Sequence, residues 1–211
     1  MSKLLFIPSG YEEDFMFEDF EETKPIPSPS PCADIYLGGR GSELFAEHSL
    51  PVLLGRLEKN VIELGPGSHG GLAPELIAAG KHYTGLDINS NHTLRAQAAQ
   101  PNATYLVGHL TDRVQELKGP ASIISTNVLD LIRDSSAGQT YMGKLTDAIT
   151  ALARPGTLSV HYAQEQPHLP RTMFAHHMQE RGWRREPFTT PYGHDSNATL
   201  VLTYKPDVTH Q

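Results

Sequence analysis

Short apolar runs recur from residue 61 to about residue 183, and segments with apolar residues at helical spacing separate them. The first run, 61–64, breaks at a glycine turn and is followed by a helix-like segment from Ala73 to Ala78, with Gly80 placed to cap it. A second apolar run covers 83–88. Because parallel strands need a helical crossover between them, this alternation predicts an α/β fold with a doubly wound, mostly parallel sheet.

Both flanks of this region have patterns of their own. Residues 42–59 are typical of a helix with an interruption at Pro51, and they lead into the first strand. A helix is expected over 168–181. The last two pieces, 184–190 and 198–204, have the pattern of strands joined by a loop.

The beginning of the chain has a different composition. Residues 10–31 combine four aromatic side chains with seven acids and end in a proline-rich stretch, so this segment cannot form a core of its own. A lid over a site and a tail packed on the domain are equally compatible with it. We expect an N-terminal extension or lid over 1–41, one domain over 42–205 and a short tail over 206–211.

Composition and charge narrow the class of protein. The chain has 211 residues and a formal net charge of −7, which removes the usual electrostatic drive for nucleic-acid binding. No apolar run approaches the ~20 residues of a membrane span. Cys32 is the single cysteine, so no intrachain disulfide forms, and a reducing, cytoplasmic location is expected.

Candidate chemistry is concentrated after the first strand. Gly65 and Gly67 allow a backbone to approach a ligand closely, and the segment that follows offers free N–H groups at a helix start. Asp87 ends the second strand, where a carboxylate suits the paired hydroxyls of a ribose. The pattern predicts a nucleoside-binding site.

A nucleoside-binding site of this kind can hold a dinucleotide or a nucleoside ligand without phosphate. Gly65, Gly67 and Gly70 satisfy the spacing of a dinucleotide fingerprint, with Asp87 at about the expected distance. However, Glu63 would repel a pyrophosphate and would attract an ammonium group instead. The proline between the glycines lacks an N–H, and about sixty residues precede the motif. A ligand with a ribose, a positive charge and no phosphate fits better.

At this point the chain resembles the class I S-adenosylmethionine-dependent methyltransferases. Residues 63–67 (ELGPG) look like the acidic, glycine-rich first motif of that family, and Asp87 matches its ribose-binding acid. Residues 122–132 are similar to the fourth strand, and 152–162 resemble the turn that enters the fifth. The ordered set extends over residues 60–205. The resemblance implies a Rossmann-like sheet of seven strands with a C-terminal antiparallel hairpin.

The same resemblance implies a cofactor and its binding residues. The cofactor is S-adenosylmethionine, and the implied contacts come from Glu63, Gly65, Pro66, Gly67, His69, Asp87, Ile88, Asp112 and Asn127. Four places depart from the family pattern. His69 stands where the third glycine is expected, Asp130-Leu131 replaces Glu-His, and Gly156-Thr157 replaces a double glycine. Gly108-His109 replaces Gly-Asp, which leaves Asp112 as the one acid available to face the adenine.

Methyl transfer from a sulfonium needs alignment and sometimes the removal of a proton. Candidates for these tasks lie where the strands end: His161 and Tyr162 at the end of the fifth strand, and His194 in the loop between the last two. No metal site is expected, because His176 and His177 are adjacent and face different sides of a helix.

We therefore predict an S-adenosylmethionine-dependent methyltransferase that acts on a small molecule, with an amine or an aromatic compound as candidates. The sequence leaves two alternatives open. One is an enzyme that binds the same cofactor for a reaction other than methyl transfer, such as aminopropyl transfer. The other is a non-catalytic scaffold, which would have no need of Glu63 and Asp87. The sequence indicates neither a nucleic-acid nor a membrane partner and leaves the oligomeric state open.

Overall fold

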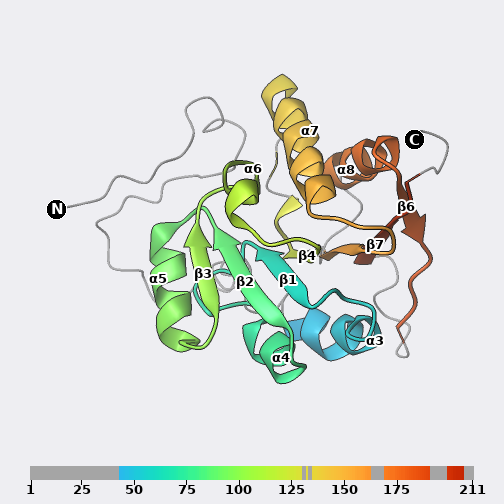
Figure 1. Cartoon of the computed structure of the whole chain (residues 1–211). Coiled ribbons are helices and arrows are strands. Elements are labelled where there is room, and N and C mark those ends of the chain that lie inside the picture. Colours follow the sequence, from blue (N-terminus) through green and yellow to red (C-terminus); the bar gives the residue numbers. More distant parts are fainter. Residues whose placement is uncertain (1–42, 130–131, 133–134, 163–168, 191–198, 207–211) are drawn as a thin grey trace.

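A computed structural model describes residues 43–129, 132, 135–162, 169–190 and 199–206 (Figure 1). The predicted extension over 1–41, the loop that contains His194 and the last five residues lie outside this part of the chain. No helix within the described ranges is long and apolar enough to cross a membrane.

A single sheet of seven strands forms the centre of the described structure, in the order β3-β2-β1-β4-β5-β7-β6. The strands are β1 (Asn60–Leu64), β2 (His82–Asp87), β3 (Thr104–Val107), β4 (Ala121–Thr126), β5 (Leu158–Tyr162), β6 (Trp183–Glu186) and β7 (Thr199–Tyr204). The pairings among β1 to β5 are parallel, whereas β7 is antiparallel to both β5 and β6. The predicted parallel sheet with a terminal antiparallel hairpin is confirmed.

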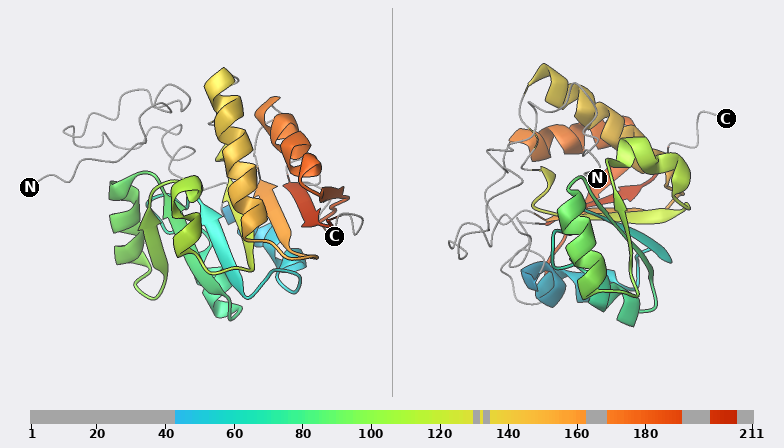
Figure 2. Two further views of the ribbon diagram at one scale, coloured as in Figure 1. Left: turned by 45° about the horizontal axis from the view of Figure 1, so that its top comes forward. Right: turned by 90° about the vertical axis from the view of Figure 1, so that its left-hand side faces the viewer.

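Helices cover both faces of this sheet (Figures 1 and 2). One face carries η2 (Phe45–Ser49), α3 (Leu50–Leu53), α4 (Ala73–Ala78) and α5 (Ser90–Ala99). The other face carries α6 (Leu110–Arg113), α7 (Ser136–Ala151) and α8 (Leu169–Glu180), and the short η3 (Val114–Glu116) follows α6. Each face has its own apolar core, because strands buried on both sides must be covered on both sides.

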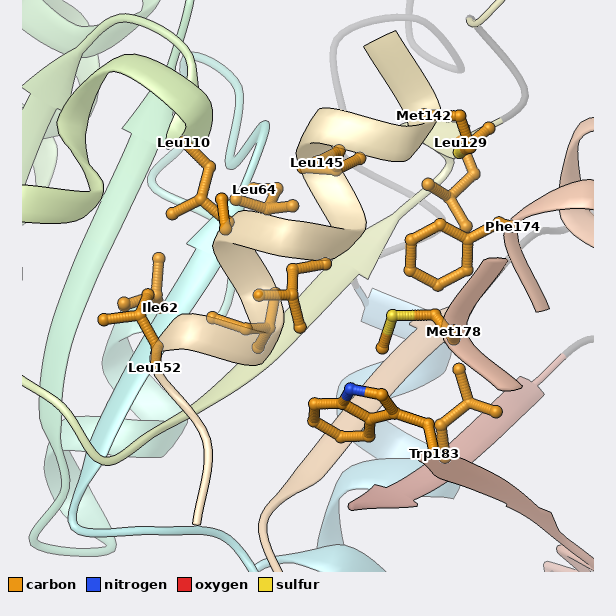
Figure 3. Close-up of a cluster of buried hydrophobic side chains, with 14 of the residues drawn as sticks. Ile62, Leu64, Leu110, Leu129, Met142, Leu145, Leu152, Phe174, Met178 and Trp183 are labelled. Carbon is orange, nitrogen blue, oxygen red and sulfur yellow. The ribbon is translucent and has the colours of Figure 1, made fainter. Parts of the chain in front are cut away.

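The core beneath α7 and α8 is built around large side chains (Figure 3). Phe174 and Met178 of α8 and Trp183 at the start of β6 are fully buried there, in one cluster with Met142 of α7. The indole nitrogen of Trp183 donates to the hydroxyl of Thr150 at 2.9 Å. Its one polar atom is therefore satisfied, which burial of a tryptophan requires.

The elements follow the sequence pattern closely, with local differences at prolines. The predicted helix over 42–59 ends at Leu53, and its interruption is a π-helical turn just before Pro51, in which the Leu50 N–H donates to the Phe45 carbonyl. Strand β6 stops at Glu186 instead of residue 190, because Pro187 has no N–H for the sheet.

Gly80 ends α4 as predicted. Its φ of 73° is left-handed, and the N–H groups of Gly80 and Lys81 donate back to the carbonyls of Ile77 and Leu76 at 2.8 and 2.9 Å. These bonds satisfy the last carbonyls of the helix and direct the chain into β2.

Close packing across β2 generates a testable prediction. A Cβ at Gly85 would lie 2.5 Å from the Tyr105 ring and 3.0 Å from Pro66, so we expect Gly85→Ala to cost about 1–3 kcal/mol of unfolding free energy. Gly143, inside α7, has open space around it, and Gly143→Ala should stabilise the protein by about 0.5–1 kcal/mol. Urea unfolding of both variants measures this, and equal effects would contradict the packing described.

Candidate functional site

The ends of three neighbouring strands converge at one edge of the sheet. Because β1 pairs in parallel with both β2 and β4, their carboxyl ends lie side by side. The N–H of Gly65 donates to the Leu86 carbonyl at 2.8 Å, and the N–H of Gly67 donates to Asp87 Oδ2 at 3.1 Å. The glycine loop, residues 65–72, is thereby attached to the end of β2. This is the switch point at which open α/β sheets bind ligands.

Two glycines of the loop are required by its geometry. Gly65 and Gly67 have φ angles of 64° and 68°, in the left-handed region that favours glycine. A Cβ at Gly65 would also lie 2.5 Å from Val128 Cγ2, just after β4. The predicted residues at the ends of β1 and β2 are therefore brought together, and the segment after β4 packs directly against them.

The carboxylate of Asp87 is held in place by backbone donors on both sides. Its Oδ2 accepts from Gly67 and its Oδ1 accepts from the N–H of Asn89 at 2.8 Å. His92 Nδ1 lies 3.6 Å from Oδ2. A carboxylate has about four acceptor positions, so these contacts leave capacity for further donors such as ribose hydroxyls.

Glu63 is the fully buried charge of the site. Its Oε2 accepts from the N–H of Leu72 at 2.8 Å and from the hydroxyl of Tyr83 at 2.7 Å, while Oε1 has no partner among the described residues. Burial raises the pKa of Glu63 to about 7; the two donors oppose this shift, and the charges of Glu75 and Asp87 add to it. A group that titrates near neutrality thus lies directly behind the glycine loop.

Asn127 is the first residue after β4, and its backbone conformation is uncommon. Its φ of 59° is left-handed, and its backbone N–H donates to the Tyr162 carbonyl at the end of β5, at 2.8 Å. Asparagine tolerates this region better than most residues, and backbone strain of this kind concentrates at functional sites. The geometry places Asn127 at the same edge of the sheet as Gly65.

The remaining predicted contacts lie in different surroundings. Pro66 is buried and packs against Gly85, and Ile88 is half-buried against the core beneath α7. The side chain of His69 is exposed on the loop. Asp112 is exposed in α6, where its Oδ1 accepts from the Thr111 hydroxyl. Among the described residues, it forms no hydrogen bond or ion pair with Asp87 or the glycine loop.

His161 is enclosed, whereas the sequence interpretation placed it at the open strand end as a proton acceptor. Alternation along β5 turns its side chain under Phe174, with ring centroids 4.4 Å apart. Its Nδ1 lies 2.8 Å from Ser125 Oγ and its Nε2 2.7 Å from Ser159 Oγ. Burial, and then the charge of Arg171, lower the pKa of His161 to about 3. In this arrangement it is a neutral core histidine with both ring nitrogens engaged.

Tyr162 is also buried, and its ring packs 5.8 Å from that of Phe45, between centroids. It therefore contributes to the core on the η2 face, where the sequence interpretation expected a pocket residue. His194 lies outside the described residues. Within the ranges described, no group of three or more His, Cys, Asp or Glu side chains is arranged to hold a metal ion.

Some residues that shape the site were not identified from the sequence. Tyr83 and Tyr105 reach the glycine loop from β2 and β3, and their apolar strands gave no sign of this. Asn89 caps α5 by accepting from the N–H groups of Asn91 and His92. An asparagine before a helix is a recognisable N-cap signal, so this one residue was detectable.

Sequence and structure comparisons give different results. No protein-family model and no curated protein matches the sequence. The amino pentose methyltransferase of calicheamicin biosynthesis from Micromonospora echinaspora, solved with S-adenosylmethionine, is similar in structure. Its TM-score is 0.62 at 10% identity, and the match covers 87% of this chain and 100% of that one.

Two further solved methyltransferases are similar in structure at low sequence identity. Magnesium protoporphyrin IX methyltransferase from Synechocystis PCC 6803 has a TM-score of 0.61 at 15% identity, with 86% of this chain and 87% of that chain covered. A TehB-like methyltransferase from Corynebacterium glutamicum has a TM-score of 0.51 at 17% identity, with coverages of 70% and 80%. This chain therefore has the fold of the class I S-adenosylmethionine-dependent methyltransferases.

Proposed function

We propose that the protein is an S-adenosylmethionine-dependent methyltransferase with a small-molecule substrate. The observation that carries this proposal is the bond between the Gly67 N–H and Asp87, which joins the glycine loop to an acceptor carboxylate at the switch point of this fold. A loop whose backbone approaches a ligand and a carboxylate suited to a ribose are then parts of one site.

The residues fit the nucleoside half of that cofactor. Asp87 lies at the end of β2 with both oxygens oriented by backbone donors, so its remaining acceptor positions are fixed before a ligand arrives. Hydrogen bonds from hydroxyls to such a charged acceptor are among the stronger ones. Asp87 would therefore hold the ribose and, through Gly67, keep the loop against it.

Glu63 supplies the preference for a positive charge. Within the described part of the chain, Oε1 of its buried carboxylate has no hydrogen-bond partner. The carboxylate lies close behind Gly71, where a Cβ would be only 2.3 Å from Oε2. A negative charge behind the loop repels a pyrophosphate and attracts the ammonium and sulfonium groups of S-adenosylmethionine. The dinucleotide alternative is disfavoured on the same ground.

When bound, S-adenosylmethionine supplies a methyl group that its sulfonium already activates. This chain then has to bind and orient the reactants, which is the larger part of catalysis by proximity. Asn127 lies beside the loop at the end of β4 and would contribute polar contacts there. The amino pentose and protoporphyrin methyltransferases act on small molecules, as their names state, which supports the same class of substrate here.

The first prediction from the proposed function concerns cofactor choice. At a concentration of about 100 times its dissociation constant, S-adenosylhomocysteine should stabilise the full chain by about 2.7 kcal/mol, whereas NAD and NADP should not. Thermal unfolding with each compound measures this. Stabilisation by a nicotinamide cofactor alone would reject the proposal. Product analysis with labelled S-adenosylmethionine then separates methyl transfer from aminopropyl transfer and from a non-catalytic scaffold.

The second prediction concerns the ribose contact. Asp87→Ala should weaken S-adenosylhomocysteine binding at least about tenfold, because charge-assisted hydrogen bonds to the ribose are lost. Asp147→Ala, at an exposed acid of α7, is the matched control and should leave affinity unchanged. Calorimetry measures both, with circular dichroism to verify folding. Equal affinities for the two variants would show that Asp87 does not contact the ligand.

The third prediction uses the ionisation of Glu63. Its pKa is raised to about 7 in the folded protein, so its stabilising contribution is complete below about pH 4.5 and is lost as pH rises through about 7. Glu63→Gln cannot ionise, and its unfolding free energy should therefore improve relative to wild type between pH 5 and pH 8. At pH 8 the same variant should bind S-adenosylhomocysteine about tenfold more weakly, because the attracting charge is gone.

Urea unfolding at pH 5, 6, 7 and 8 tests the stability part of this prediction. A constant difference between the variant and wild type across that range would mean that Glu63 does not titrate there. Calorimetry at pH 8 tests the second part, and an unchanged affinity would remove Glu63 from the recognition of the ligand charge.

A further inference from the structure

The carbonyl of Gly70, within the glycine loop, points toward the sheet and is held there from two strands. The hydroxyl of Tyr105, on β3, donates to it at 2.9 Å, and the hydroxyl of Tyr83, on β2, lies 3.3 Å from it. The N–H of Ala73 also donates to it at 3.3 Å. Two buried phenol groups from neighbouring strands thus meet at one backbone oxygen of the loop.

The two hydroxyls have different tasks. Tyr83 has one proton and lies closer to Glu63 Oε2, at 2.7 Å, than to the Gly70 carbonyl. Tyr105 is therefore the main hydroxyl donor to Gly70, whereas Tyr83 donates to Glu63 and lies beside that carbonyl. Burial, followed by the charge of Glu63, raises the pKa of Tyr105 to about 12, so it remains a donor at neutral pH.

The glycines around these groups make room for them. A Cβ at Gly70 would lie 2.6 Å from the Tyr105 hydroxyl, and one at Gly71 would lie 2.3 Å from Glu63 Oε2. Both residues also have left-handed φ angles, of 88° and 56°. The loop therefore lies directly on the hydroxyls and the carboxylate beneath it, with no side chain between.

This packing decides which way the backbone donors face. In a trans peptide the carbonyl and the next N–H point in opposite directions, so an inward Gly70 carbonyl turns the Gly71 N–H away from the tyrosines. The backbone N–H groups of Ser68, His69 and Gly71 have no acceptor within the described part of the chain. The loop's own hydrogen bonds therefore leave these three donors unused.

We propose that Tyr105 and Tyr83 are positioning residues for the cofactor, which orient the glycine loop through the Gly70 carbonyl and through Glu63. This inference rests on the function proposed above. The rings alone would fill the same volume, since Tyr83 and Tyr105 pack edge to face with centroids 5.7 Å apart. The hydroxyls are what a phenylalanine pair would lack, and each of them is directed at the loop or at the carboxylate behind it.

The test removes one hydroxyl at a time and leaves the ring. We expect Tyr105→Phe and Tyr83→Phe each to weaken S-adenosylhomocysteine binding about three- to tenfold in calorimetry, because the loop is no longer held in its binding orientation. Tyr204→Phe is the matched control: Tyr204 is half-buried on β7 against Trp183, away from the loop, and its change should leave affinity unaltered.

A pH profile adds a readout that a purely structural role would not change. Affinity should rise as Glu63 loses its proton near pH 7. Tyr83→Phe removes a donor to that carboxylate, so the midpoint of the rise should move to higher pH. The groups that face Glu63 from the surrounding elements, namely Glu75, Asp87 and Tyr105, are unchanged in this variant, and Tyr204→Phe should keep the wild-type midpoint.

The possible results separate the two proposals. If wild type fails to bind S-adenosylhomocysteine at any pH, the proposed function is wrong and the positioning role is rejected with it. If wild type binds, and Tyr83→Phe and Tyr105→Phe both match Tyr204→Phe in affinity and in pH midpoint, the positioning role alone is rejected. Weaker binding together with an upward shift of the pH midpoint in Tyr83→Phe supports the positioning role. A lower Tm of the variant does not change this result, because stability alone does not shift the midpoint.

Discussion

The buried carboxylate of Glu63 is the constraint on which the rest of the site depends. A charge in the interior is costly unless donors surround it, and here the donors are the Leu72 N–H and the Tyr83 hydroxyl. To reach them, the loop after β1 has to fold back over the carboxylate, which requires glycine at position 71. The conformation that supplies these donors also presents the loop backbone at the edge of the sheet.

The two apolar cores hold the carboxyl-end edge of the sheet in place. α7 and α8 cover one face and η2, α3, α4 and α5 cover the other, so β1, β2 and β4 are fixed from both sides. Residues at their ends then need only short contacts to meet, such as Gly67 with Asp87. Sites carried on a rigid scaffold of this kind keep their geometry without large contacts of their own.

Local sequence signals were sufficient for much of this arrangement. The apolar runs, the glycine turn at Gly65 and Gly67 and the cap at Gly80 each depend on residues close together in the chain. The helical segments between the apolar runs indicated parallel strands, because parallel neighbours need a crossover connection. Asp87 was identifiable because it ends a strand next to such a turn. His161 was misjudged because proximity to a strand end does not specify the face to which a side chain points.

The sequence by itself thus determined the doubly wound sheet, its terminal hairpin and the residues that approach one another at the ends of β1 and β2. Only the tertiary structure decided what surrounds each polar group. It enclosed His161 between Ser125 and Ser159, and it brought Tyr83 and Tyr105 from separate strands to one carbonyl of the loop. The physical reason is that secondary structure follows from short-range periodicity, whereas hydrogen-bond partners and burial depend on contacts between residues far apart in the chain.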